Sequence, residues 1–79
     1  MSTELVEYLA RRLVDDPDAV RAEEIERDGD VVIELRVAPD DVGKVIGRQG
    51  RIARALRTLV RASAAREGRR VMVEIADTE

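Results

Sequence analysis

The sequence predicts an α+β fold in the order helix, strand, strand, helix, helix, strand, with three helices on one face of a three-stranded mixed sheet. Residues 31–37 and 71–76 alternate apolar and polar side chains, as half-buried strands do. Residues 3–14 and 51–66 instead repeat apolar side chains every three or four positions, as amphipathic helices do. With 79 residues, we expect one domain spanning 1–79.

The first helix is predicted over residues 3–14. Its apolar stripe recurs at every fourth position and consists of Leu5, Leu9 and Leu13. The helix is expected to end before Pro17, because the residue that precedes a proline is driven out of the helical region.

Two strands follow, over residues 20–28 and 31–37. In the first, the odd step from Ala22 to Ile25 breaks the alternation and predicts a bulge around residues 23–24 of an edge strand. A hairpin turn is expected at residues 28–30, where Gly29 supplies the positive φ that tight turns need. The second strand alternates regularly, which predicts a central position with one apolar row facing the core.

A short helix is predicted from Pro39 to Gly47, with Asp40 and Asp41 as acidic caps of its first turn. A longer helix extends from residue 51 to about residue 66. One arc of this helix carries Ile52, Leu56, Leu59, Val60 and Ser63, and the opposite arc carries Arg51, Arg54, Arg57 and Arg61. The last strand covers residues 71–76, and residues 77–79 are expected to form a frayed end.

The two helices between the second and third strands form a connection long enough for a parallel pairing. Such crossovers are right-handed almost without exception. We therefore expect the strand at 31–37 to lie in the centre, antiparallel to the first strand and parallel to the third.

The chain has no cysteine and no histidine, so disulfides, thiolate metal ligands and the commonest general base are all absent. We therefore expect a binding module rather than an enzyme, with no catalytic residues, no metal, no cofactor and no small-molecule substrate. No apolar segment approaches the length of a membrane span and no secretion signal is evident, which predicts a cytoplasmic protein.

Charge is distributed unevenly along the chain. Residues 43–70 hold nine basic residues and one acidic residue, a net charge of +8, whereas the remaining residues hold five basic and 16 acidic residues, a net charge of −11. Such an asymmetry within a small domain indicates a basic surface suited to a polyanion. The alternative is that the arginines only keep a helix face soluble.

The basic segment contains Gly43, Gly47 and Gly50, and this spacing decides against a nucleotide pocket. A Walker A loop requires four residues between its two glycines and then Lys and Ser or Thr, but here three residues separate Gly43 from Gly47, and Arg48 follows. The dinucleotide fingerprint requires two glycines one residue apart directly after a strand, which this chain lacks.

Three interpretations of the segment stay open. Two helices joined by a glycine-containing turn resemble a DNA-binding helix-turn-helix, although strands flank this pair on both sides. Gly47 and Gly50 are also compatible with a plain turn in a structural or assembly subunit. The third interpretation is a clamp on a nucleic-acid backbone, in which two glycines permit close approach, the following helix offers N–H groups, and Arg48 adds charge.

The stretch VIGRQGRI, residues 45–52, resembles the signature of KH domains, and the order of elements is similar to the type II, prokaryotic arrangement. The resemblance covers essentially the whole chain and is strongest to small bacterial single-KH-domain RNA-binding proteins. It implies that the loop from Gly47 to Gly50 clamps about four single-stranded nucleotides. It further implies that bases lie on an apolar groove with Ile46 and Ile52, beside the central strand, whose main chain reads base edges.

The residues expected to contact RNA are Lys44, Val45, Ile46, Gly47, Arg48, Gln49, Gly50, Arg51, Ile52 and Arg54. Among them, Lys44 and Arg51 are the expected phosphate contacts beside the loop. The one aromatic residue, Tyr8, lies far from this segment, so base stacking on aromatic rings is not expected and one domain alone is expected to bind with weak sequence preference.

The family resemblance also implies partners and physiology. It implies a homodimer, or a heterodimer with a larger KH-containing RNA-binding protein, and a second copy would raise the avidity for RNA. It further implies RNA chaperoning or post-transcriptional regulation, linked to cell-wall growth and cell shape.

Overall fold

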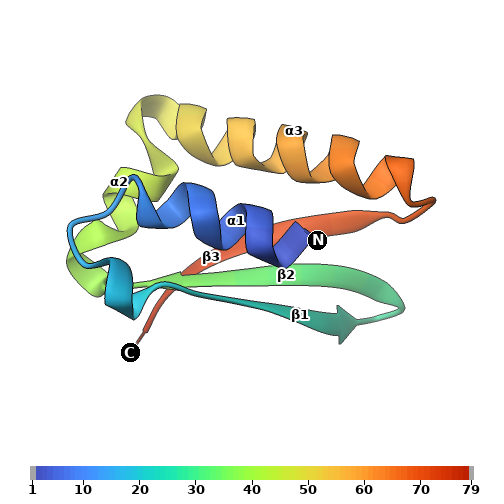
Figure 1. Ribbon diagram of the computed structural model, residues 1–79, viewed down its shortest axis with the longest axis horizontal. Coiled ribbons are helices and arrows are strands. Elements are labelled where there is room, and N and C mark those ends of the chain that lie inside the picture. The colour runs from blue at the N-terminus through green and yellow to red at the C-terminus, as the bar shows by residue number, and fades with distance from the viewer. Residues whose placement is uncertain (1, 79) are drawn as a thin grey trace.

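The computed structural model describes residues 2–78 and confirms the predicted order of elements. The helices are α1 (Ser2–Arg11), α2 (Val42–Ile46) and α3 (Arg51–Arg66), and the strands are β1 (Arg21–Arg27), β2 (Asp30–Val37) and β3 (Val71–Asp77). Single 3₁₀ turns occupy Pro17–Ala19, Pro39–Asp41 and Arg48–Gly50. The helices lie together on one face of the sheet, which leaves the other face open (Figure 1).

The sheet has the order β1-β2-β3, with β1 antiparallel and β3 parallel to the central strand β2. This arrangement is the predicted one. Because β2 is paired on both sides, its main-chain groups are taken up by the two ladders, and the free edges belong to β1 and β3. The expectation that the main chain of the central strand reads base edges is therefore wrong.

The core lies between the sheet and the helices and is built from aliphatic side chains. Ile33, Leu35 and Val37 of β2 are fully buried, which confirms the predicted apolar row of the central strand. The other buried members of this core are Val6, Ala10, Val20, Val45, Leu56, Val60, Ala64, Val71 and Val73.

Helix α1 ends at Arg11, three residues before the predicted end. Its last turn tightens, because the N–H of Leu13 donates to the carbonyl of Ala10 at 3.0 Å. The buried side of α1 contains Val6 and Ala10, while Leu13 is exposed. The predicted leucine stripe thus marks the right side of the helix but not its buried centre.

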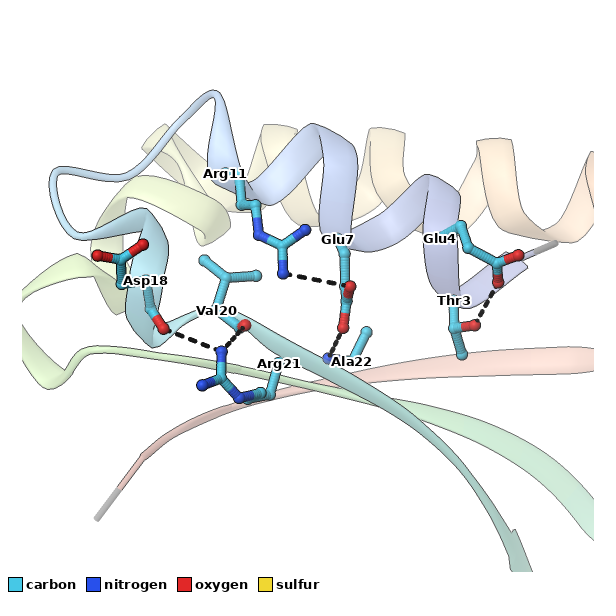
Figure 2. Close-up of polar contacts among 8 residues, drawn as sticks. All are labelled: Thr3, Glu4, Glu7, Arg11, Asp18, Val20, Arg21 and Ala22. Carbon is cyan, nitrogen blue, oxygen red and sulfur yellow. Dashed lines mark hydrogen bonds and ion pairs between the residues drawn. The ribbon is translucent and has the colours of Figure 1, made fainter.

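Strand β1 carries no bulge, contrary to the expectation at residues 23–24. Its pairing with β2 runs without interruption from Arg21 opposite Arg36 to Arg27 opposite Asp30. At one position of its free edge, β1 bonds to α1, since the Glu7 carboxylate accepts a 2.9 Å hydrogen bond from the N–H of Ala22 (Figure 2).

The buried side of α3 also differs from the predicted arc. Ala53, Leu56, Val60 and Ala64 are buried, whereas Leu59 is half exposed. At the other end of the chain, Asp77 belongs to β3 and the N–H of Thr78 donates to the carbonyl of Val37 at 2.9 Å. The frayed end expected at 77–79 is therefore wrong for these two residues, and Glu79 lies outside the described residues.

Replacing Gly43 with alanine is expected to raise the free energy of unfolding by about 0.5–1 kcal/mol, because glycine loses more backbone entropy than alanine in a helix. Gly43 lies in α2, and a Cβ atom added to it meets no other atom within 4 Å. Urea denaturation of both proteins measures the change. A lower free energy of unfolding in the variant would show that α2 needs the glycine for a reason other than space.

Candidate nucleic-acid interface

The loop between α2 and α3 is one tight turn closed by its own backbone. Gly47 ends α2 with φ 78° and ψ 171°, and the N–H of Gly50 donates to the Gly47 carbonyl at 3.1 Å. Gln49 also has a positive φ, of 57°, which is uncommon for a residue with a side chain. The turn therefore presents the exposed side chains of Arg48 and Gln49 at its tip.

Gly47 is required at its position for two independent reasons. Its backbone angles lie in a region that is essentially restricted to glycine. A Cβ atom at this position would also lie 2.6 Å from Cγ1 of Ile52. Ile52 therefore packs directly beneath the loop.

Two backbone N–H groups that are available to a ligand lie at the tip of the loop. The N–H groups of Gly50 and Arg51 already donate to the carbonyls of Gly47 and Arg48. Those of Arg48 and Gln49 make no hydrogen bond to any of the described residues. The tip thus offers two N–H donors beside the Arg48 guanidinium.

Two arginines from the first turn of α3 hold the loop in this shape. Arg54 Nη2 donates to the Gln49 carbonyl at 3.1 Å, and Arg51 Nη2 donates to Gln49 Oε1 at 3.3 Å. Both guanidinium groups are exposed and keep further N–H donors for a ligand. Arg51 and Arg54 therefore combine loop support with positive charge.

Lys44 points to the opposite side, toward the segment after α1. Its Nζ forms ion pairs with Asp15 at 3.2 Å and with Asp41 at 3.3 Å. The hydrogen bonds to Asp15 and Asp41 raise the pKa of Lys44 above its usual value. Of the two expected phosphate contacts, Arg51 thus lies at the loop, while the charge of Lys44 is shared with two carboxylates.

Asp41 is not the helix cap that the sequence suggested. Its carboxylate is almost completely buried and accepts hydrogen bonds from the N–H groups of Asp15 at 3.2 Å and Asp16 at 3.0 Å. Burial pushes the pKa of Asp41 upward, but these two N–H groups and Lys44 outweigh it and hold the pKa below its usual value. The carboxylate therefore fastens the turn after α1 to the start of α2.

The remaining apolar residues of the motif separate into core and surface. Val45 is fully buried, while 38% of Ile46 is exposed beside the loop. Ile46 and the half-buried Ile52 thus supply the apolar surface near Gly47, and Val45 anchors α2 in the core.

A groove of about 620 Å³ lies between α3 and the free edge of β3. It is lined by Arg57, Arg61, Arg70, Val71, Met72, Val73 and Glu74. Arg57 Nε donates to the Val73 carbonyl at 3.4 Å, so the main-chain groups of Val73 face the groove and not β2.

Within the described part of the chain, the arginines of α3 have no acidic partner. Arg11, Arg27, Arg36 and Arg69 form ion pairs with glutamates, all of them outside α3. Among the described residues, none of the arginines of α3 forms an ion pair, and neither does Arg48 or Arg70. Apart from Lys44 and Arg69, the basic residues of the segment 43–70 therefore keep an unpaired charge in the folded chain.

The chain matches the family model described as "KhpA/KhpB, KH domain" over residues 3–75. It belongs to the KhpA/KhpB KH-domain family. It is 60% identical over 72 residues to the RNA-binding protein KhpA of Caldanaerobacter subterraneus subsp. tengcongensis, covering 91% of this chain and 96% of that protein. It is 55% identical to the RNA-binding protein KhpA of Aquifex aeolicus over 74 residues, covering 94% of each chain.

Two features of other functional classes are absent from the part of the chain that the structure describes. Within residues 2–78, no three His, Cys, Asp or Glu side chains gather as a metal site would require. None of the described helices has the length and apolar character needed to cross a membrane.

The glycine motif gave no indication that a groove lies beside the loop, lined by Arg57, Arg61, Arg70 and the edge of β3. The spacing of Arg57 and Arg61 by four residues was the available signal, because it places both on one side of α3. That β3 lies opposite them follows from the crossover, which returns the chain after α3 so that β3 pairs in parallel with β2.

Proposed function

We propose that this chain is a single-domain RNA-binding protein that clamps about four single-stranded nucleotides with the loop from Gly47 to Gly50. The observation that carries the proposal is the loop itself, in which Gly47 has no room for a side chain and the N–H groups of Arg48 and Gln49 bond to no described residue. The names of the relatives, each an RNA-binding protein, favour the same ligand.

In this proposal each part of the site has a distinct task. Phosphate oxygens accept from the two loop N–H groups and from Arg48 and Arg51, since charge-assisted hydrogen bonds to guanidinium are short and strong. Bases rest on the apolar side chains of Ile46 and Ile52. The main chain of β3 at Val73 offers one donor and one acceptor for a base edge. No ring stacking is involved, because Tyr8 is on α1.

The same proposal includes a protein partner, a cellular location and a physiological role. We place the protein in the cytoplasm, as a homodimer or as the smaller half of a heterodimer with a larger KH-containing protein. Exposed apolar side chains in the helical layer, Tyr8 on α1 and Leu59 on α3, support such an interface. RNA chaperoning linked to cell-wall growth and cell shape is the physiology that the family resemblance favours.

Replacing both Arg48 and Gln49 with aspartate is expected to weaken binding to a short single-stranded RNA by at least tenfold, about 1.4 kcal/mol. The change puts two carboxylates where the phosphate would lie. Fluorescence anisotropy at several salt concentrations measures the affinity, and circular dichroism verifies folding. Affinity should fall with salt in every case, because binding releases counterions from the RNA.

The control carries Arg12→Asp and Thr78→Asp, the same change of charge on exposed residues outside the loop. It should bind RNA within about threefold of the wild type, about 0.65 kcal/mol. Unchanged RNA affinity in the folded loop variant would contradict the clamp. Tighter binding of the wild type to duplex DNA than to RNA would favour the helix-turn-helix interpretation, and no binding to either would favour a structural subunit.

A further inference from the structure

The outer edge of β1 has main-chain groups without hydrogen-bond partners among residues 2–78. The N–H of Ala22 donates to the Glu7 carboxylate of α1, so the main chain of Ala22 points away from β2. Successive residues of an antiparallel strand direct these groups alternately toward and away from the neighbouring strand. The N–H and C=O groups of Glu24 and Glu26 therefore also point outward, and no hydrogen bond from a described residue reaches them.

This edge is acidic as well as unpaired. Strand β1 has three exposed glutamates, Glu23, Glu24 and Glu26. The Glu24 carboxylate is paired with Arg69 at 2.6 Å, whereas Glu23 and Glu26 form no ion pair with any described residue. Because side chains alternate along a strand, Glu23 lies on the open face of the sheet and Glu26 on the face that the helices cover. An uncompensated carboxylate thus flanks the outward groups on each face.

The other side chains of β1 leave the middle of the edge acidic. The two arginines of the strand lie at its ends, where Arg27 pairs with Glu74 and Arg21 donates to two main-chain carbonyls of the preceding turn. Between them, Ile25 is half-buried on the open face, beside Val32 of β2. The edge therefore combines two free carboxylates with one apolar side chain.

The charges of β1 act against pairing with a second copy of the same strand. In an antiparallel pair centred on Glu24, this residue would lie opposite its own counterpart. Moving the register by one residue pair puts Glu23 opposite its counterpart, or Glu24 opposite Glu26. Like charges directly opposite each other destabilise a pair of strands, and charged side chains are a common protection of sheet edges. A strand of opposite charge meets no such repulsion.

We propose that the edge of β1 binds an extended basic segment of a protein partner, which joins the sheet as an antiparallel fourth strand. The main chain of the segment pairs with Glu24 and Glu26, as in other cases of strand addition. Its basic side chains lie opposite Glu23 and Glu26, and an apolar side chain covers Ile25. The proposal does not rest on RNA binding, because the edge of β1 shares no residue with the loop from Gly47 to Gly50.

The test uses the capped peptide TKVTKVT, which places lysine opposite Glu26 and Glu23 and valine opposite Ile25. NMR titration of the isotope-labelled chain locates the peptide, and amide hydrogen exchange reports the pairing. At saturation, exchange of the Glu24 and Glu26 amides should slow at least about fivefold, because they gain acceptors. The amides of Glu23 and Ile25 already face β2, so their exchange should change by less than about twofold.

Reversing the two free charges, by Glu23→Lys with Glu26→Lys, should weaken the peptide at least about tenfold. The control is Asp18→Lys with Asp40→Lys, the same change of charge at exposed residues outside β1, which should bind within about threefold of the wild type. Circular dichroism verifies folding of both variants. Equal losses in the two variants would mean that only net charge attracts the peptide, and would overturn the proposal.

Two further peptides separate main-chain pairing from charge. A TKVTKVT peptide methylated at the main-chain nitrogens opposite Glu24 and Glu26 keeps its charge but loses two donors, so it should bind at least about tenfold more weakly. The peptide TEVTEVT should not bind. Undiminished affinity of the methylated peptide, or binding of the acidic one, would overturn the proposal. Slower exchange of the Glu24 and Glu26 amides at rising protein concentration without peptide would overturn it in favour of a second copy.

Discussion

Replacing Gly47 with alanine is expected to abolish RNA binding by the loop and to lower the free energy of unfolding by at least about 2 kcal/mol. The backbone at Gly47 has φ 78° and ψ 171°, which a residue with a Cβ atom adopts only under strain. The new methyl group would also lie 2.6 Å from Cγ1 and 2.9 Å from Cβ of Ile52. Because Cβ of Ile52 is fixed to the backbone of α3, rotation of the Ile52 side chain cannot relieve the clash.

The matched control is Gly50→Asn at the other end of the same turn. Gly50 has φ 74° and ψ 16°, the left-handed helical region that asparagine tolerates, and an added Cβ atom there lies 4.0 Å from the nearest atom, Arg54 Nη2. This variant should lose at most about 1 kcal/mol and bind RNA measurably. Urea denaturation and anisotropy with an RNA four-mer measure both effects. Equal losses in the two variants would show that the close contact with Ile52 does not determine the shape of the loop.

The strands could be predicted from the sequence because alternation is a local property. Each residue of β2 has a side chain on one of two faces, and burial of Ile33, Leu35 and Val37 is already visible in the spacing. The order of the strands followed from the lengths of the connections, since a short turn gives an antiparallel pair and a two-helix crossover permits a parallel one. The prediction of a bulge in β1 is wrong because polar residues interrupt the apolar alternation of this edge strand without interrupting its pairing with β2.

The buried sides of the helices could be predicted only approximately. In α1 and α3 the most deeply buried positions include the small residues Ala10, Ala53 and Ala64, while Leu13 and Leu59 are partly exposed. Two helices that lie side by side on one sheet approach each other most closely where side chains are small, whereas a hydrophobic stripe shows only the average direction of the core. Which leucines stay exposed is thus decided by packing between the helices.

For the site, the loop could be predicted and its surroundings could not. The spacing of Gly47 and Gly50 reflects backbone angles that the local sequence must satisfy, and both glycines have positive φ. The partner of Lys44, in contrast, is determined by the fold, because Asp15 reaches it from the turn after α1. The groove with Arg57 and Arg70 likewise exists only once β3 has been placed beside α3.

Replacing Asp41 with asparagine is expected to destabilise the protein at neutral pH and to remove part of its sensitivity to acid. The buried carboxylate accepts from the N–H groups of Asp15 and Asp16 and pairs with Lys44. An asparagine has one acceptor oxygen, and its NH₂ group would face one of these N–H donors. In the unfolded chain water solvates residue 41, so the substitution weakens interactions of the folded state only. The midpoint of urea denaturation should therefore decrease.

The direction of the pH dependence follows from the pKa of Asp41, which the two N–H groups and Lys44 hold below the usual 3.8 despite the opposing effect of burial. A carboxyl group whose pKa is lower in the folded state contributes stability above pH 3.8, and this contribution disappears as the pH falls through the folded pKa. The midpoint of urea denaturation of the wild type should therefore exceed that of the variant most at neutral pH, and the difference between the two midpoints should shrink below pH 3.8.

Asp40→Asn is the control, because it makes the same substitution at the exposed neighbouring position. It should leave the midpoint of urea denaturation almost unchanged at neutral pH. A difference between wild type and Asp41→Asn that stays constant from neutral to acidic pH would show that the site needs only a hydrogen-bond acceptor, and not a charge. A shrinking difference would instead show that an ionised carboxylate holds the start of α2, whose five residues lead into the glycine loop.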